Sequence, residues 1–436
     1  MSPDPELPKS TDVVVIGGGI IGTSAAFMLA RDGVRVALCE KAHIACEQSS
    51  RNWGWCRQAG RDEREIPLIM ESLGLWREMD QLTEGVTGFR ECGVLYVGKS
   101  EADEARFDAW RTMAAGYGLR PELVRGTKLQ ELMPGAHHSY TCGLHMASDG
   151  CAEPQKAAPT IVRAAQRAGA TVHTNCAVRG LELSAGRVSG VITERGRIQC
   201  SAVILAGGAW SSLFCGNLGL RLPQLKVLSS VMRTAPVANG PTTCTFMHDL
   251  GYRKRLDGGY TIARGTAAYD VPLVPDSLRF LREYMPTLRK ERANIRPQIN
   301  AQSWLELRTP RRWALDAISP FEHTRVLDPA PNPNFNREAR QAMARLYPEF
   351  ESVRTVQEWA GYIDVTPDVV PYIGPAKSIP GLTIATGFSG HGFGIGPGAG
   401  RLAAALATER TPFVDPTPFR VSRFADGSPI VIGVEL

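Results

Sequence analysis

What the sequence lacks narrows the classes of protein that it can encode. No apolar stretch reaches the roughly 18 residues that a membrane-spanning helix needs. The opening segment, MSPDPELPKSTD, is polar and acidic, and it has neither the positive start nor the apolar run of a secretory signal. Internal repeats and low-complexity tracts are also missing. We therefore expect a cytoplasmic chain without a membrane span.

Cysteine pairs spaced for metal binding are a second absence. None of the ten cysteines takes part in a C-x-x-C pair, which disfavours zinc sites and thioredoxin-like redox motifs. Without an export signal, free thiols in a reducing compartment are expected, and we predict no metal site. The cysteines are Cys39, Cys46, Cys56, Cys92, Cys142, Cys151, Cys176, Cys200, Cys215 and Cys244.

The length and the net charge of the chain limit the number of domains and the kinds of ligand that we expect. A chain of 436 residues is long enough for one large domain or two interleaved domains with a real core. Hydrophobic residues make up 43% and charged residues 21%, as in ordinary globular proteins. The net charge of +5 is diffuse. It favours anionic small molecules over nucleic acid, for which we expect no binding.

Three apolar segments, far apart in the chain, each end in glycines. Residues 12–16, 202–206 and 382–386 read as strands buried on both faces. A helix through Ala30 and a strand over 34–39 follow the first of them. In an open parallel sheet such turns gather at the carboxyl edge, where ligands bind. This pattern predicts one nucleotide-binding domain assembled from discontinuous pieces.

The first glycine turn carries a dinucleotide fingerprint. Gly17, Gly19 and Gly22 form a G-x-G-x-x-G pattern between a strand and a helix, which is the required context. The glycines permit the tight turn and the close approach of a pyrophosphate, and the helix N-terminus offers N–H groups to it. Glu40 ends the second strand and is placed to accept from ribose hydroxyls.

A second glycine run distinguishes FAD from NAD. Residues 387–398 form a long glycine-rich turn that presents backbone N–H groups at the start of another helix, with a good helix former over 401–407. Such an end can stabilise the negative charge that develops on the pyrimidine side of a reduced flavin. An NAD domain does not need it. We therefore predict FAD.

A second domain is indicated between these pieces. Residues 251–264 read as a hairpin around 257–259, which implies an antiparallel sheet. The predicted fold class is α/β, with a Rossmann-like FAD-binding domain and a second α+β substrate domain built on that sheet. The predicted FAD-binding domain comprises residues 1–92, 150–226 and 364–436, and the substrate domain comprises 93–149 and 227–363, with an Arg- and Pro-rich insertion of helices and loops around 275–345.

Taken together, these motifs resemble the D-amino-acid oxidase superfamily, which includes glycine oxidase, sarcosine oxidase and D-amino-acid dehydrogenases. The resemblance spans roughly residues 10–410. It is carried by the GGGIIG motif with Glu40 and Lys41, the Ser49–Gly54 segment, the Gly207–Trp210 turn, Thr366-Pro-Asp368, and the GFSGHGF run from Gly387 to Phe393.

The resemblance implies that an antiparallel sheet covers the flavin. It also implies oxidation of a C–N bond to an imine, which water then hydrolyses. Carried over by position, it implies cofactor contacts from Gly17, Gly19, Ile21, Gly22, Glu40, Lys41, Ser49, Ser50, Arg51, Asn52, Val178, Gly207, Trp210, Gly390, Gly392, Phe393 and Gly394.

The sequence departs from this family pattern at several positions. Ile363 occupies the slot where glycine oxidase and D-amino-acid dehydrogenases place a carboxylate-binding Arg. Gly394 and Ala263 stand where sarcosine oxidase has Lys, the second of which helps oxygen react, so a dehydrogenase is favoured over an oxidase. Trp53 stands where the dimethylglycine dehydrogenase type has its flavin-linking His. Non-covalent FAD is therefore expected.

Several side chains are candidates for substrate chemistry. His391 lies in the flavin-facing turn and is the candidate proton acceptor, because the amine must be neutral before hydride leaves. Arg57 is the candidate anchor for a substrate anion, at about the place of the sarcosine oxidase Arg. The hydroxyls of Tyr252, Tyr260 and Tyr362, the Asp364 carboxylate and the Trp55 ring are further candidates, each with ordinary packing or turn capping as the alternative.

The predicted activity is transfer of a hydride from the C–N carbon of a small amine or an N-substituted or D-amino acid to flavin N5, with O2 or another compound as electron acceptor. Two alternatives stay open at this point. One is an FAD-dependent 2-hydroxy-acid dehydrogenase of the same architecture. The other is a flavin subunit that acts only within a larger electron-transfer complex.

Overall fold

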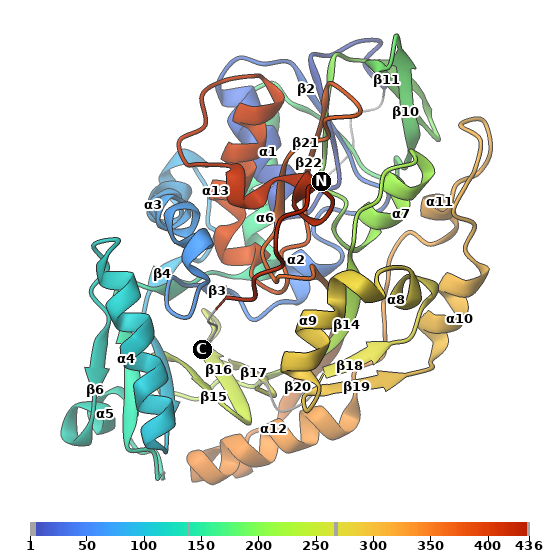
Figure 1. Cartoon of the computed structure of the whole chain (residues 1–436). Coiled ribbons are helices and arrows are strands. Elements are labelled where there is room, and N and C mark those ends of the chain that lie inside the picture. Colours follow the sequence, from blue (N-terminus) through green and yellow to red (C-terminus); the bar gives the residue numbers. More distant parts are fainter. Residues whose placement is uncertain (1–5, 138, 266–268, 434–436) are drawn as a thin grey trace.

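Two large sheets organise the molecule (Figure 1). The computed structural model describes residues 6–137, 139–265 and 269–433. A six-stranded sheet has the order β21-β22-β13-β1-β2-β9, and a ten-stranded sheet has the order β19-β18-β14-β17-β16-β15-β5-β7-β6 with β20 paired to β14. Two three-stranded sheets, β10-β11-β12 and β3-β8-β4, complete the strand pairings.

The smaller of the two large sheets confirms the predicted Rossmann-like arrangement. The three apolar segments form its adjacent strands β1, β13 and β22, which pair in parallel, and only β21 at the edge runs antiparallel to its neighbour. Their side chains are buried, as the continuous apolar runs require. The strands are β1 (Val13–Ile16), β2 (Val36–Cys39), β9 (Thr171–His173), β13 (Ala202–Leu205), β21 (Tyr372–Pro375) and β22 (Leu382–Thr386).

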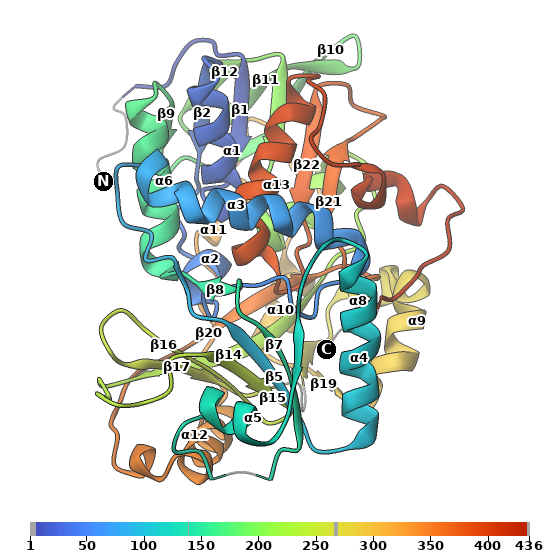
Figure 2. The same cartoon turned by 90° about the vertical axis from the view of Figure 1, so that its left-hand side faces the viewer.

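Close helix packing covers this sheet. Helices α1 (Ile20–Arg31) and α13 (Gly392–Ala407) lie side by side in Figures 1 and 2, flanked by α3 (Ile66–Leu82) and α6 (Pro154–Arg167). The prediction of a glycine-rich turn over 387–398 is therefore partly wrong, because its second half is helical. Gly396 and Gly400 permit the close approach, since a Cβ there meets Ile20 at 2.7 Å and Ser24 at 2.5 Å.

The larger sheet is mainly antiparallel, as predicted. Strand β14 pairs with β20 along its whole length, and the predicted hairpin is present as β16 and β17. Figures 1 and 2 place α12 beneath this sheet. The strands are β5 (Val94–Gly98), β6 (Glu122–Val124), β7 (Cys142–Met146), β14 (Leu225–Thr234), β15 (Cys244–Met247), β16 (Leu250–Lys254), β17 (Tyr260–Ala263), β18 (Tyr269–Pro272), β19 (Ile295–Gln298) and β20 (Thr355–Val365).

The Arg- and Pro-rich segment was expected to contain only helices and loops, but it also contains β19, which pairs in parallel with β18. Its helices are α8 (Pro275–Arg279), α9 (Leu281–Glu291), α10 (Ala301–Arg308), α11 (Pro320–His323) and α12 (Pro333–Leu346). The other elements are α2 (Gln48–Arg51), α4 (Glu101–Ala115), α5 (Gly126–Leu132), α7 (Ser211–Asn217), β3 (Trp55–Cys56), β4 (Arg90–Glu91), β8 (Gly150–Cys151), β10 (Val178–Ser184), β11 (Arg187–Thr193) and β12 (Gly196–Gln199).

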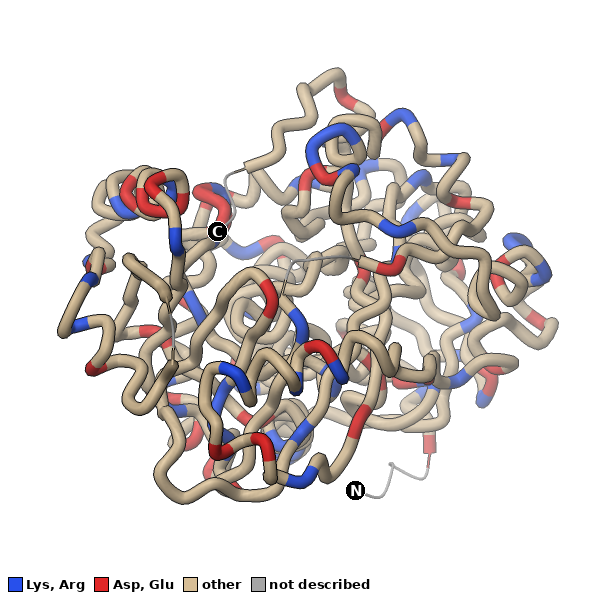
Figure 3. The backbone as a smooth tube through the Cα atoms, turned by 90° about the horizontal axis from the view of Figure 1, so that it is seen from below, with Lys and Arg blue, Asp and Glu red and all other residues tan. Residues whose placement is uncertain are grey.

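Charge is mixed over the face seen from below, where Lys and Arg segments alternate with Asp and Glu segments (Figure 3). Among the described residues, no helix is both long enough and apolar enough to cross a bilayer.

Candidate active site

A cavity of about 410 Å³ lies where the six-stranded sheet faces the larger one. The carboxyl ends of β1, β2, β13 and β22 contribute Ile16, Cys39, Leu205 and Thr386 to its wall. The opposite wall comes from β14 and β20. Its position at the carboxyl edge of a parallel sheet is where such folds bind ligands, and its size is that of a small-molecule site.

The glycine fingerprint lies at one end of this cavity and fits a dinucleotide. Gly17 has a φ of +109°, and a Cβ there lies 2.4 Å from the carbonyl oxygen of Ala206. Gly19 is the N-cap of α1 and carries no capping side chain, so the helix end stays open to the cavity. Backbone N–H groups and a positive helix end are the donor set that a pyrophosphate requires.

Glu40 is fixed beside this helix end. Its Oε2 accepts from the Gly18 N–H at 2.7 Å and its Oε1 accepts from the Ala42 N–H at 2.8 Å. Burial raises the pKa of this carboxyl, and the two N–H donors oppose that rise. Each carboxylate oxygen has a further lone pair, so the group can still accept from ribose hydroxyls. The residues present therefore fit the ADP half of FAD.

Short helix α2 forms a second wall of the site. Ser49 Oγ accepts from the Ile20 N–H at 2.9 Å, which ties α2 to the start of α1. Arg51 donates to Asp328 Oδ1 and to the Ala360 carbonyl, both at 2.8 Å, so its guanidinium links α2 to the larger sheet. Asn52 donates to the carbonyls of Gln48 and Ser49 and ends the helix.

Lys41 and Trp210 meet at the wall of the cavity. The Lys41 ammonium lies 4.5 Å from the centre of the Trp210 ring, and both side chains donate to Glu47. This packing holds the loop after β2 against the turn after β13.

Most of the predicted cofactor residues line the cavity, and three do not. Gly22, Ser50 and Gly394 lie outside the lining. Gly22 packs against Gly17, and Gly394 packs against β3, where a Cβ lies 2.9 Å from the Trp55 carbonyl oxygen. The predicted cofactor residues that do line it are Gly17, Gly19, Ile21, Glu40, Lys41, Ser49, Arg51, Asn52, Val178, Gly207, Trp210, Gly390, Gly392 and Phe393.

A buried ionisable group contacts His391 at the start of α13. Nδ1 of His391 lies 3.0 Å from Glu65 Oε2, and Arg61 lies 3.9 Å from the same oxygen and also donates to the His391 carbonyl. Burial raises the pKa of Glu65 to about 7, against the opposing charge of Arg61. Sequence patterns missed Glu65, because it stands among other charged residues before α3 and only tertiary packing buries it.

Two arginines line the cavity. Arg57, which the sequence predicted, donates to the Ala59 carbonyl and stacks over the Tyr96 ring at 5.6 Å. Arg264 was missed. It lies over the Phe335 ring at 4.6 Å, its Nη2 is 3.3 Å from the half-exposed Glu338, and its buried Nη1 has no hydrogen-bond partner among the described residues. Its place at the end of β17 gave no sequence signal.

Aromatic side chains form a third wall. Trp53 and Trp55 meet edge to face at 5.4 Å between ring centres, and Phe246 packs against Trp55 at 6.2 Å and Tyr96 at 5.4 Å. All four rings line the cavity. The wall therefore offers a large apolar surface near the Arg57 guanidinium.

Asp364 lines the cavity but its carboxylate is occupied. Oδ2 accepts from Gln224 Nε2 at 2.9 Å, from Thr386 Oγ1 at 3.2 Å and from the Gly387 N–H at 2.8 Å. Burial raises the pKa of Asp364 to about 6, and these donors oppose the rise. Asp364 therefore fixes the turn after β22, and we no longer assign it the expected contact with a cationic group of the substrate. Tyr362 also lines the cavity, and burial raises the pKa of its hydroxyl to about 12.

The structure does not bring Tyr252 and Tyr260 to the cavity. Both are buried on the α12 side of the larger sheet, where the Tyr252 hydroxyl bonds to Tyr347 at 2.8 Å and the Tyr260 hydroxyl donates to the Pro241 carbonyl at 2.8 Å. Side chains alternate between the two faces of a strand, so this orientation points them away from the cavity. The expected contact of these hydroxyls with substrate is therefore not retained.

The fold and the cavity define a class: a Rossmann-like dinucleotide-binding protein whose ligand cavity is covered by a large antiparallel sheet. The family model of FAD dependent oxidoreductases, DAO, matches residues 12–406. The chain belongs to this family. It is an FAD-dependent oxidoreductase, and the family implies a flavin cofactor that the glycine cradle and Glu40 fit.

Among solved structures, the chain is similar to the L-amino acid deaminase from Proteus myxofaciens in complex with anthranilate, with 32% identity and a TM-score of 0.94 over 98% of this chain and 96% of that one. Among curated proteins, glycine oxidase of Pseudomonas aeruginosa is 27% identical over 94% of this chain and 98% of its own length.

Other curated relatives are longer. The 4-methylaminobutanoate oxidase (formaldehyde-forming) of Paenarthrobacter nicotinovorans is 24% identical over 97% of this chain, and mouse mitochondrial sarcosine dehydrogenase is also 24% identical over 97%. The chain spans 47% and 42% of their lengths, a little under half in each case.

Proposed function

We propose that this protein oxidises an α-amino acid with a large apolar side chain at its C–N bond. The Cα hydrogen leaves as a hydride, the product is an imino acid, and water hydrolyses it to a 2-oxo acid and ammonia. Bound FAD, held without a covalent link, supplies the hydride acceptor. In this proposal residues 93–149 and 227–363 serve substrate binding, and the remainder of the chain serves the cofactor.

The observation that carries the proposal is the buried Nη1 of Arg264, which has no hydrogen-bond partner within residues 6–137, 139–265 and 269–433 and belongs to a cavity that the aromatic wall also lines. A buried donor without an acceptor costs free energy, and a carboxylate supplies the acceptor. Arg57 offers a second guanidinium on the same cavity. The carboxylate of a bound amino acid accepts hydrogen bonds from the arginines. Its bulky side chain packs against the rings of Trp53, Trp55 and Phe246.

One relative supports an α-amino acid as substrate and adds a stereochemical preference. The L-amino acid deaminase to which the chain is 32% identical supports an L-amino acid, in place of the D- or N-substituted amino acid expected from motifs. Ile363 at the slot where an Arg was expected supports a different carboxylate anchor. Because Ala263 is a buried strand residue and offers no cation, we propose an acceptor other than O2.

His391 is the proposed proton acceptor, and Glu65 controls which of its ring nitrogens is basic. When Glu65 is ionised it accepts from the Nδ1–H group, which leaves Nε2 able to take a proton from the substrate ammonium. When Glu65 is protonated it donates to Nδ1, and the ring hydrogen then sits on Nε2. Protonation of Glu65 therefore removes the base.

The pH dependence follows from the pKa of Glu65. Because burial raises it to about 7, kcat/KM is expected to rise about tenfold per pH unit from pH 5 and to level off above about pH 7. The Glu65→Gln variant should lose this acidic limb, whereas Glu63→Gln, at an exposed residue of the same helical turn, should keep it. A limb that persists unchanged in Glu65→Gln would show that another group titrates.

The reaction class is tested by flavin bleaching. The purified holoenzyme is mixed without oxygen with L- and D-amino acids, N-methyl amino acids and 2-hydroxy acids, and the oxidised flavin absorbance is followed. Bleaching by L-phenylalanine or L-leucine is expected, with slow return of colour in air. Bleaching by hydroxy acids alone contradicts the C–N reaction. No bleaching by any compound favours a flavin subunit that needs its partner.

A further inference from the structure

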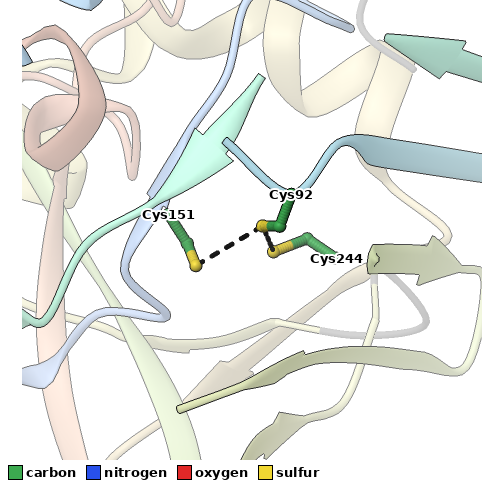
Figure 4. A group of neighbouring side chains, drawn as sticks. All are labelled: Cys92, Cys151 and Cys244. Atoms are coloured by element: carbon green, nitrogen blue, oxygen red, sulfur yellow. Dashed lines mark hydrogen bonds between the residues drawn. The ribbon is translucent and has the colours of Figure 1, made fainter. Parts of the chain in front are cut away.

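Three cysteines from distant parts of the chain meet (Figure 4), in the same hydrophobic cluster as Trp55 and Tyr96 of the aromatic wall. Cys92 follows β4, Cys151 ends β8, and Cys244 begins β15. Cys92 Sγ lies 3.6 Å from Cys151 Sγ and 3.5 Å from Cys244 Sγ, and the three sulfurs all lie within 4.8 Å of one another. We call this group the thiol cluster. It lies outside the cavity lining, so the proposed reaction does not use it.

The spacing of the sulfurs matches a metal site. A Zn–S bond of about 2.3 Å places two ligand sulfurs about 3.8 to 4.0 Å apart in tetrahedral or trigonal geometry. The separations of 3.6 and 3.5 Å from Cys92 therefore need to open by only a few tenths of an ångström. Thiolates are the ligands that select Cu⁺ and Zn²⁺. Among the described residues no His, Asp or Glu joins the group, which favours an ion that accepts three ligands.

The exposure of Cys92 and the charged groups around the thiol cluster also favour a bound metal ion. Cys151 and Cys244 are fully buried, whereas Cys92 is only partly buried and opens the thiol cluster to solvent. The guanidinium groups of Arg253 and Arg90 lie close enough to stabilise negative charge on Cys151. Arg253 is fully buried and pairs with Glu153 Oε1 at 2.9 Å, and Nη1 of Arg90 lies 3.7 Å from the same oxygen, so two guanidinium groups share one carboxylate. Three thiolates around a monovalent cation keep a net negative charge, which the positive charge left on this Arg–Glu group partly offsets.

We propose that the thiol cluster binds one thiophilic d¹⁰ cation, with Cu⁺ preferred to Zn²⁺ because three sulfurs complete its coordination. Cys151 pairs with Trp55 between β8 and β3, so the bound ion ties the backbone of the aromatic wall to β4 and β15. The site is independent of the proposed substrate class and of the anchor role of Arg264.

The test measures metal directly. Holoenzyme purified under anaerobic reducing conditions is titrated with Cu⁺ against a chromophoric Cu⁺ chelator, and separately with Zn²⁺, and native mass spectrometry counts bound ions. One Cu⁺ per chain is expected, with a shell of sulfur alone in X-ray absorption. Cys92→Ser should weaken Cu⁺ retention at least tenfold, and Cys215→Ser, a buried cysteine of α7, should leave it unchanged.

Three results overturn the proposal. The first is wild-type protein that retains no Cu⁺ or Zn²⁺ against a weak chelator. The second is retention that Cys92→Ser does not change. The third is a Cys92–Cys151 disulfide after treatment with hydrogen peroxide in protein that binds neither metal, which would make the cluster a redox pair. Circular dichroism checks the folding of Cys92→Ser, and protection of wild-type Cys92 from alkylation by added Cu⁺ provides a second measurement that needs no variant.

Discussion

Replacing Arg264 by alanine is expected to lower kcat/KM for the amino acid by about 100-fold, because loss of a partner from a buried charge pair costs about 2–5 kcal/mol. The guanidinium has one buried Nη1 without a partner among the described residues, and the substrate carboxylate is its proposed acceptor. The effect should fall mainly on KM if the carboxylate binds equally in ground and transition states. Steady-state kinetics and titration with a carboxylate analogue, followed by the flavin spectrum, measure it.

Three comparison variants sharpen this result. Arg264→Lys keeps the charge and loses the planar fork, so it should recover only part of the activity. Arg57→Ala should cost less, because its guanidinium already donates to the Ala59 carbonyl and stacks on Tyr96. Tyr252→Phe, on the far face of the sheet, should leave KM unchanged. If Arg57→Ala raises KM and Arg264→Ala does not, Arg57 is the anchor and the assignment of Arg264 is wrong.

Replacing Gly22 by alanine is expected to remove most of the bound FAD. A Cβ at this position lies 2.0 Å from the Gly17 carbonyl oxygen and 3.3 Å from Val15. Helix α1 must therefore move away from strand β1 and the glycine turn. The turn that positions the pyrophosphate then shifts. The flavin-to-protein absorbance ratio of the purified protein should fall at least tenfold. This variant acts through packing, because Gly22 does not itself line the cavity.

A control and a second variant separate cofactor loss from misfolding. Gly74→Ala in α3 meets open space and should raise stability by roughly 0.5–1 kcal/mol, with a full complement of FAD. Gly19→Val places its side chain at the cavity, where a Cβ already lies 3.0 Å from Ser49 Oγ. It should keep the circular dichroism of the fold and lose FAD. A full complement of FAD in Gly19→Val would contradict the proposed cofactor site.

The substrate side of the site shows where sequence patterns stop. His391 and Arg57 were predicted and line the cavity, whereas Tyr252 and Tyr260 were predicted and point to the opposite face. A hairpin pattern identifies two strands, but register and sheet packing decide which face meets the cavity. Arg264, at the end of the same hairpin, went unnoticed for the same reason.

The sequence by itself determined the local and periodic features of this protein. Continuous apolar runs such as 202–206 specify buried parallel strands, and Gly17, Gly19 and Glu40 specify the dinucleotide turn, because strand, turn and helix signals are short-range. Only the tertiary structure decided which distant groups meet: Glu65 with His391, Arg264 with Phe335, and Cys92 with Cys151 and Cys244. These contacts join residues separated by long stretches of chain, and their burial, which sets their charge and reactivity, exists only once the sheets have packed.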